Sequence, residues 1–152
     1  MKQLFFILGV FICSNLFGQS GVYVIDNNYK RKDIDETIMK WTLTLNEEGT
    51  FIYHFIRDLS AISKPNMEEN FYGKGTWKAE KNLIFFYSDK EKDLNEKYIY
   101  DFTNTKARWI TKSPRDLSGK EVKESLLFYE SDLSVIKGLK FYKKSKYIPI
   151  FD

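Results

Sequence analysis

Few side chains in this sequence have the chemistry and the neighbours that catalysis needs. His54 is the single histidine and Cys13 the single cysteine, so the several nitrogen or sulfur ligands of a zinc site are missing. Asp101 in YIYDF and Glu130 after LLFY are acids beside apolar residues, where burial could raise a carboxyl pKa far enough for acid–base catalysis. Acids in such places are more often at strand ends or face outward, and a lone histidine is more often structural.

Sequence motifs for catalysis are missing as well. The chain contains no Gly-x-Ser-x-Gly elbow, no phosphate-binding glycine loop and no His-Glu-x-x-His pair. It also has no spaced Asp/Asn/Gly loop of the kind that binds calcium between two helices. We therefore expect a protein that is not an enzyme and that uses no metal and no cofactor.

Aromatic residues give the stronger signal, because they make up 17% of the chain and recur at alternate positions. Alternation over a short run is typical of a β-strand with one buried face. The side chains that we expect on the inward face, as candidate ligand contacts, are Trp41, Phe51, Tyr53, Phe55, Trp77, Phe85, Tyr87, Tyr98, Tyr100 and Trp109.

Two interpretations of this aromatic face remain open. An eight-stranded barrel is just wide enough for its own side chains to fill, so the rings could form a core. Alternatively, the rings line a cup for a ligand, because a buried tyrosine hydroxyl without a partner costs roughly 1–3 kcal/mol. Arg57 and Arg108 could then hold an acidic or polar end of the ligand at the barrel mouth. The small residues that would leave room beside the rings are Gly73, Gly75, Ala79 and Ala107.

The elements that must position these residues are short strands, because period-two patterns dominate after residue 20. IMKWTLTL and TFIYHFIR alternate on either side of the turn NEEG, in which Gly49 can take the positive φ of a hairpin bulge. We assign the next tight turn to residues 80–81, and we expect Gly138 to mark a bulge or bend in the last strand. The predicted strands span residues 21–25, 38–45, 50–57, 72–79, 82–88, 97–102, 106–111, 124–130 and 133–143.

Strands that follow one another through short turns usually pair as neighbours. The sequence therefore predicts an all-β fold, an antiparallel meander of about eight to nine strands. Eight or more such strands can close into a barrel, which removes the exposed edges of the sheet.

Two phrases in the middle of the chain carry a family resemblance. KWTLTLNEEGTFIY and GKGTWKAEKNLIFFYS resemble the strand–turn–strand phrases of lipocalin-like domains in exported bacterial proteins. The shared pattern is a tryptophan-bearing strand, an acidic turn with glycine, an aromatic strand, and then Gly-Thr-Trp before a short turn and an apolar strand. The resemblance covers residues 38–111 and implies a small barrel of the lipocalin-like (calycin) type. It leaves the ligand open, since a fold does not transfer function.

The first eighteen residues read as a secretory signal peptide, with Lys2 followed by a short apolar run and small residues. The run is too short for a transmembrane anchor, which needs about 20 residues. Lipid attachment at Cys13 is disfavoured, because Ile12 is large where a lipobox has a small residue. We therefore expect an exported protein, periplasmic or secreted, with a leader at 1–18 and one barrel domain at 19–152.

Charge argues against nucleic acid as a partner. The formal charge is +3, and lysine supplies most of the positive side chains without forming a cluster free of acids. We expect a protein that binds an apolar or amphipathic small molecule. The alternative is a barrel without a cavity that contacts a protein or another envelope component through the charged loops 89–96 and 112–123.

Overall fold

The computed structural model describes residues 18–31, 34–59 and 67–145. The predicted leader, apart from Gly18, lies outside these ranges, and so does Cys13. In the described ranges, no helix is long and apolar enough to cross a membrane.

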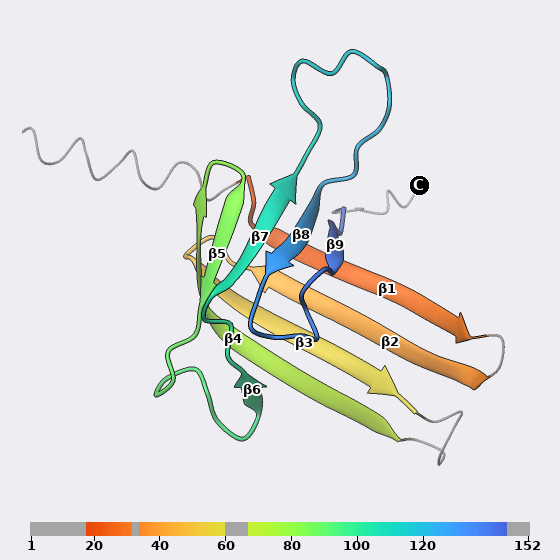
Figure 1. Ribbon diagram of the computed structural model, residues 1–152, viewed down its shortest axis with the longest axis vertical. Helices are drawn as coiled ribbons and strands as arrows, with labels where there is room; N and C mark the ends of the chain where they lie inside the picture. Colours follow the sequence, from red (N-terminus) through yellow and green to blue (C-terminus); the bar gives the residue numbers. More distant parts are fainter. Residues whose placement is uncertain (1–17, 32–33, 60–66, 146–152) are drawn as a thin grey trace, which may run out of the picture.

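The described chain forms a single nine-stranded sheet (Figure 1). Alternating apolar and polar residues favour strands throughout, as the sequence predicts. The strands are β1 (Gly21–Arg31), β2 (Ile34–Leu45), β3 (Thr50–Asp58), β4 (Glu68–Glu80), β5 (Leu83–Tyr87), β6 (Tyr98–Tyr100), β7 (Thr105–Ile110), β8 (Ser125–Glu130) and β9 (Lys140–Lys143).

Pairing of the strands closes the sheet into a barrel. The order is β3-β2-β1-β9-β8-β7-β5-β4-β6, and an additional β3–β4 pairing joins the two ends of the eight strands other than β6. These eight strands pair antiparallel, whereas β6 runs parallel to β4. The predicted antiparallel meander and lipocalin-like barrel architecture are confirmed.

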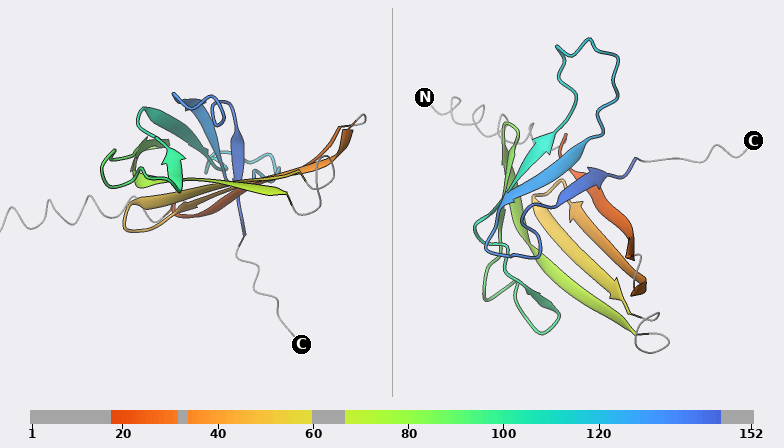
Figure 2. Two further views of the ribbon diagram at one scale, coloured as in Figure 1. Left: turned by 90° about the horizontal axis from the view of Figure 1, so that it is seen from below. Right: turned by 45° about the vertical axis from the view of Figure 1, so that its right-hand side comes forward.

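The barrel is closed along only part of its length, because its strands differ in length. Strands β1 to β4 have 9 to 13 residues each, whereas β5, β7, β8 and β9 have 4 to 6. The short strands cover one end of the β1–β4 layer, and the other end projects beyond them (Figures 1 and 2). We call the covered end the closed half. We call the projecting end of β2–β4, from Trp41, Phe55 and Phe71 outward, the open half.

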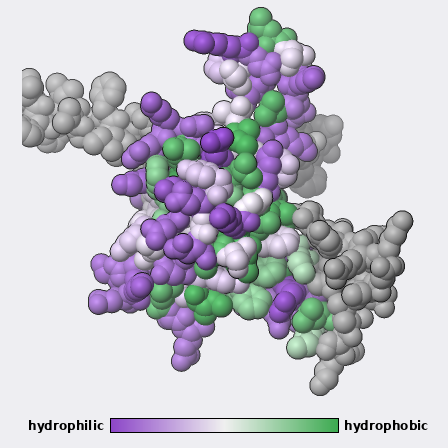
Figure 3. Space-filling view, in the orientation of Figure 1, coloured by the Kyte–Doolittle hydropathy of each residue, from purple (hydrophilic) through white to green (hydrophobic). Residues whose placement is uncertain are grey.

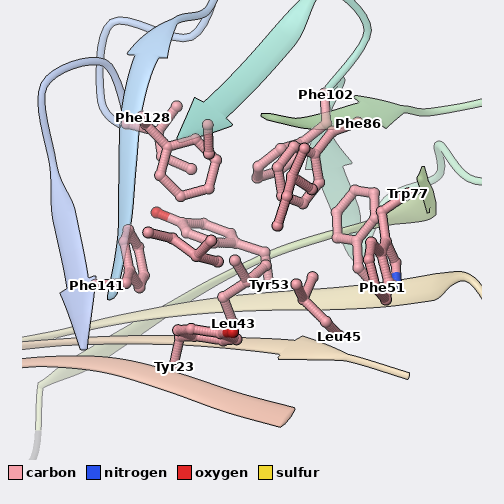
Figure 4. Packing of buried hydrophobic residues seen from close by; sticks show 14 of the residues in the cluster. Tyr23, Leu43, Leu45, Phe51, Tyr53, Trp77, Phe86, Phe102, Phe128 and Phe141 are labelled. Atoms are coloured by element: carbon pink, nitrogen blue, oxygen red, sulfur yellow. The ribbon is translucent and has the colours of Figure 1, made fainter. Parts of the chain in front are cut away.

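Large side chains occupy the closed half. Phe51 meets Phe86 and Phe102 edge-on, with ring centroids 5.1 and 5.0 Å apart, and Phe128 meets Phe141 at 5.3 Å (Figure 4). The buried apolar cluster consists of Tyr23, Ile25, Leu43, Leu45, Phe51, Tyr53, Trp77, Ile84, Phe86, Phe102, Ala107, Leu126, Phe128, Ile136 and Phe141. The outer face of the β5–β9 layer carries mainly hydrophilic side chains with scattered apolar ones (Figure 3).

The register of β5 differs from the prediction by one residue. The turn between β4 and β5 consists of Lys81 and Asn82, not of residues 80–81. A slip of one residue moves every side chain of a strand to the opposite face. Trp77 consequently pairs with Phe86, and Tyr87 lies outside with 54% of its surface exposed. The inward placement predicted for Phe85 and Tyr87 is therefore wrong.

A bulge changes the pattern in β6. Tyr98 is the partner of Tyr72 and Tyr100 is the partner of Gly73, so Ile99 is an extra residue on β6. A bulge of this kind re-aims the side chains on its two sides. Tyr98 therefore packs with Tyr72, and the prediction that it faces inward is wrong.

The last predicted strand is also shorter than expected. Residues 133–138 form hydrogen-bonded turns, with Ile136 N donating to Leu133 O, and the strand begins at Lys140. Ile136 is buried in the core, and Gly138 has a positive φ of 87° after it. The turn thus supplies a core side chain where a longer strand was predicted.

Candidate functional site

The closed half contains three of the predicted contacts as core residues. Phe51, Tyr53 and Trp77 are buried, and Trp77 Nε1 donates to Asn46 O at 3.0 Å. The room predicted beside the rings is taken, because a Cβ on Gly73 would lie 2.5 Å from the Phe102 ring. The side chains in this half pack against one another and account for its aromatic content as a core.

Gly75 is packed as closely as Gly73, here against the backbone of β5 and the Phe51 ring. A Cβ there would lie 2.1 Å from the carbonyl oxygen of Tyr87 and 3.0 Å from the Phe51 ring. Glycine is the residue that permits such close approach of two backbones. The position therefore serves β4–β5 pairing and leaves no space for a ligand.

Tyr53 is the exception within the closed half. Its ring lies near Phe102, Phe141 and Tyr100, and Figure 4 shows it pointing toward Phe141. Its hydroxyl is fully buried and has no hydrogen-bond partner in the described part of the chain. Burial, followed by the nearby Tyr100, raises the pKa of Tyr53 well above its ordinary value.

The open half carries a row of aromatic rings across neighbouring strands. Trp41, Phe55 and Phe71 occupy one register row of β2, β3 and β4. The centroids of Trp41 and Phe55 are 4.9 Å apart and those of Phe55 and Phe71 are 5.7 Å apart, with both pairs stacked. Tyr100 of β6 continues the row at 6.3 Å from Phe71. All four side chains are partly exposed, so we call them the aromatic row.

Polar groups lie directly beyond the aromatic row. Arg57 and Glu69 are register partners two residues further along β3 and β4, so they share the face of Phe55 and Phe71. Arg57 Nε donates to Glu69 Oε2 at 2.7 Å, and Arg57 Nη2 contacts the same oxygen. The guanidinium carbon also lies 5.9 Å from the centroid of the Phe71 ring.

Tyr100, the last ring of the row, lies near enough to Arg57 to feel its charge. Burial raises its pKa, and the positive charge of Arg57 acts in the opposite direction. The aromatic row is therefore flanked, beside Phe55 and Phe71, by a guanidinium and a carboxylate that partly face solvent. This combination offers an apolar surface next to both donors and an acceptor.

The remaining predicted contacts lie away from the aromatic row. Arg108 is on the outer face, where its guanidinium lies 5.8 Å from the Tyr129 ring, so the prediction that it reaches a ligand from the barrel mouth is wrong. Trp109 packs against the other end of the core, and its Nε1 donates to Glu124 Oε1 at 2.9 Å. Phe85 and Tyr98 are partly exposed on the outer face.

The three candidates for acid–base chemistry do not come together. His54 stacks on Tyr72 at 4.3 Å, Asp101 Oδ1 accepts from Thr103 N at 2.9 Å, and Glu130 accepts from Lys106 at 2.8 Å. In the described ranges, no group of three or more His, Cys, Asp and Glu side chains could hold a metal ion. These residues take part in local structural contacts.

A second cluster of polar contacts lies at the other end of the barrel. Glu124 Oε1 accepts from Lys143 Nζ at 2.7 Å, besides its bond from Trp109, and lies 3.3 Å from the hydroxyl oxygen of Tyr23. The Tyr23 hydroxyl donates to Gln19 O at 2.7 Å. Burial and then the charge of Glu124 raise the pKa of Tyr23 well above its ordinary value. This cluster joins the start of β1 to β7, β8 and β9.

A surface groove of about 1540 Å³ lies next to this cluster. It runs over the outer side of β1 and β9, between the β2–β3 turn and residues 121–124. Val22, Val122 and Tyr142 are exposed apolar residues in its lining, which also carries glutamates and lysines.

Sequence reasoning missed Phe71 and Glu69, which complete the site in the open half. They lie in EENFYG, which we assigned mainly to a connection between strands. The signal was present, because Glu69, Phe71 and Gly73 continue the alternation of the strand at 72–79 toward its start. Extending that strand would have placed Phe71 on the inward face.

Comparison with protein-family models, curated proteins and solved structures gives no match for this chain. The site must therefore be interpreted from its own geometry.

Proposed function

We propose that the protein binds an apolar or amphipathic small molecule on the open half of the barrel. The observation that carries this proposal is the aromatic row, in which Trp41, Phe55, Phe71 and Tyr100 stand side by side and remain partly exposed. Binding sites for small molecules are mostly apolar with a few polar groups that orient the ligand. Arg57 and Glu69 provide such groups beside Phe55 and Phe71.

The arrangement of the rings favours a ligand with an extended or flat apolar part. Neighbouring rings stack with interplanar angles of 19° and 20°, so they stand side by side across the sheet. Side chains on a sheet rise roughly perpendicular to it, so the rings present their edges to the open side. An acyl chain or the face of a flat ring system can lie across several edges at once.

Titration with N-phenyl-1-naphthylamine, a neutral dye that fluoresces in apolar surroundings, tests the proposal. We expect saturable binding, and we expect Phe55→Ala to weaken it at least about fivefold, because the centre of the row is removed. Tyr87→Ala is the matched control, since it removes an aromatic side chain from the outer face. Circular dichroism establishes that each variant is folded before titration.

Two outcomes would contradict the proposal. One is the absence of saturable dye binding to the wild-type protein. The other is an equal loss of affinity in Phe55→Ala and Tyr87→Ala, which would show that the dye binds apolar surface without selection. Native mass spectrometry of the protein purified from its own host then identifies any natural small molecule that it retains.

A second candidate function is an interaction module, and the groove of about 1540 Å³ is the observation that favours it. Its lining combines Val22, Val122 and Tyr142 with charged side chains of both signs, which suits a protein segment. Capture from an envelope extract tests this candidate. Replacing Val122 and Tyr142 by serine should abolish capture of a partner, whereas Tyr87→Ala should not. Unchanged capture by the double variant would reject the groove.

A further inference from the structure

The Arg57–Glu69 pair beside the aromatic row carries one positive and one negative charge. Met39, Arg57 and Glu69 form the register row that follows Trp41, Phe55 and Phe71. Residues two positions apart on a strand share a face and are separated by about 7 Å. The Arg57–Glu69 pair therefore lies beside Phe55 and Phe71, and a ligand whose apolar part covers these two rings can bring its polar end to the pair.

The charges of Arg57 and Glu69 neutralise each other. Two nitrogens of Arg57, Nε and Nη2, contact the single oxygen Oε2 of Glu69. A guanidinium has five N–H donors and a carboxylate has two acceptor oxygens, so both groups keep capacity for another partner. The side chains are 41% and 32% exposed, which leaves that capacity within reach of a ligand.

From this geometry we propose that the ligand's polar end is uncharged and carries both a hydrogen-bond donor and an acceptor, as a hydroxyl or a primary amide does. This inference rests on the proposed function of the aromatic row. One such group can accept from Arg57 and donate to Glu69 at the same time. The pair and the ligand then satisfy each other without any net charge.

Charged ligands fit the Arg57–Glu69 pair less well. A carboxylate gains the attraction of Arg57 but meets the carboxylate of Glu69 beside it, and like charges in a partly dry site repel. An ammonium group meets the opposite problem at Arg57. Either ion must also lose part of its hydration, which costs more for an ion than for a neutral polar group.

Displacement of N-phenyl-1-naphthylamine at pH 8 by decan-1-ol, decanoate and decylamine tests the inference. These probes share one alkyl chain, and at this pH the second is an anion and the third a cation. We expect decan-1-ol to bind at least about fivefold more tightly than either ion, the effect of roughly one net hydrogen bond.

The variant Glu69→Gln sharpens the experiment, because it leaves Arg57 unopposed. We expect the preference to move toward decanoate by at least about fivefold relative to decan-1-ol. Glu130→Gln is the matched control, since it removes the same charge from the Lys106–Glu130 pair on the outer face. It should leave the preference of the wild-type protein unchanged.

The outcomes separate the two proposals. If the dye binds but decanoate or decylamine displaces it as well as decan-1-ol does, the inference is overturned and the proposed function stands. An equal shift in Glu69→Gln and Glu130→Gln would also overturn it, because the preference would then follow overall charge. If neither the dye nor any probe binds, the proposed function fails and the inference fails with it.

Discussion

The closed and open halves share strands β2, β3 and β4 and differ in what faces those strands. Within the closed half, Phe51 of β3 meets Phe86 and Phe102 from other elements and is buried. Four residues further along the same strand and on the same face, Phe55 meets rings of its neighbouring strands and is only partly buried. The same residue type is a core residue in one half and a surface residue in the other.

Apolar alternation in a strand therefore does not reveal whether its inward face belongs to a packed core or to a binding surface. A strand folds with the same period whether its inward face meets a second layer or a ligand. The cover is supplied by β5, β7, β8 and β9, which are too short to reach the far end of β2–β4. Stability should therefore concentrate in the closed half and binding in the open half.

Truncation of the two phenylalanines should give the largest contrast. We expect Phe51→Ala to lower the free energy of unfolding by about 3–5 kcal/mol, because it leaves a cavity in a packed core. Phe55→Ala should cost about 1–2 kcal/mol, since part of its ring already faces water. Urea unfolding measures both values. Equal costs would show that the open half is as tightly packed as the closed half.

The buried tyrosines make a second contrast, through pH. Tyr23 and Tyr53 have pKa values raised above the ordinary value of 10.0 by burial, so the folded protein retains protons that the unfolded chain releases. Their contribution to stability is therefore complete below pH 10 and is lost as pH rises above it. Each should lower the free energy of unfolding by about 1.4 kcal/mol per pH unit in that range.

Unfolding by urea at pH 9, 10 and 11 measures this loss. Tyr53→Phe should remove one tyrosine's share of the fall in the free energy of unfolding with pH. Tyr87→Phe, on the exposed outer face, should leave that fall unchanged. A slope that is the same in all three proteins would show that the Tyr53 hydroxyl reaches solvent.

Replacement of the two buried tyrosines at pH 7 should give the smallest changes in the free energy of unfolding. It should also show which of the two hydroxyls stabilises the closed half. Tyr23→Phe loses the bond to Gln19 O and should cost about 1–2 kcal/mol. Tyr53→Phe removes a hydroxyl that has no partner in the described ranges and should be neutral or slightly stabilising. Thermal unfolding compares them. A clear loss in Tyr53→Phe would indicate a buried water bound to that hydroxyl.

The sequence predicted the architecture well, and two of its errors came from single-residue shifts. Alternation placed Phe51, Tyr53 and Trp77 inward correctly. It failed at Tyr87, where the turn begins at Lys81, and at Tyr98, where Ile99 adds a bulge. Neither shift leaves a clear mark in a period-two pattern, because a two-residue turn can move by one position and a strand can accept a bulge at little local cost.

The candidate site was predicted only in part. Trp41, Phe55, Tyr100 and Arg57 were among the expected contacts, but the ring that links them, Phe71, was not. Arg57 was expected to meet an acidic ligand, whereas its partner is Glu69. The two residues are twelve positions apart in the chain, so their contact depends on the register of β3 with β4.

By itself, the sequence determined the strands, their short turns and the class of fold, because alternation and turn residues act over a few positions. Only the tertiary structure decided which aromatic residues are covered, since cover depends on strand lengths and pairings between distant segments. It also decided that Arg57 lies against Glu69 and that Tyr53 keeps an unpartnered hydroxyl. Contacts of this kind arise when separate strands close into one barrel, and no local pattern specifies them.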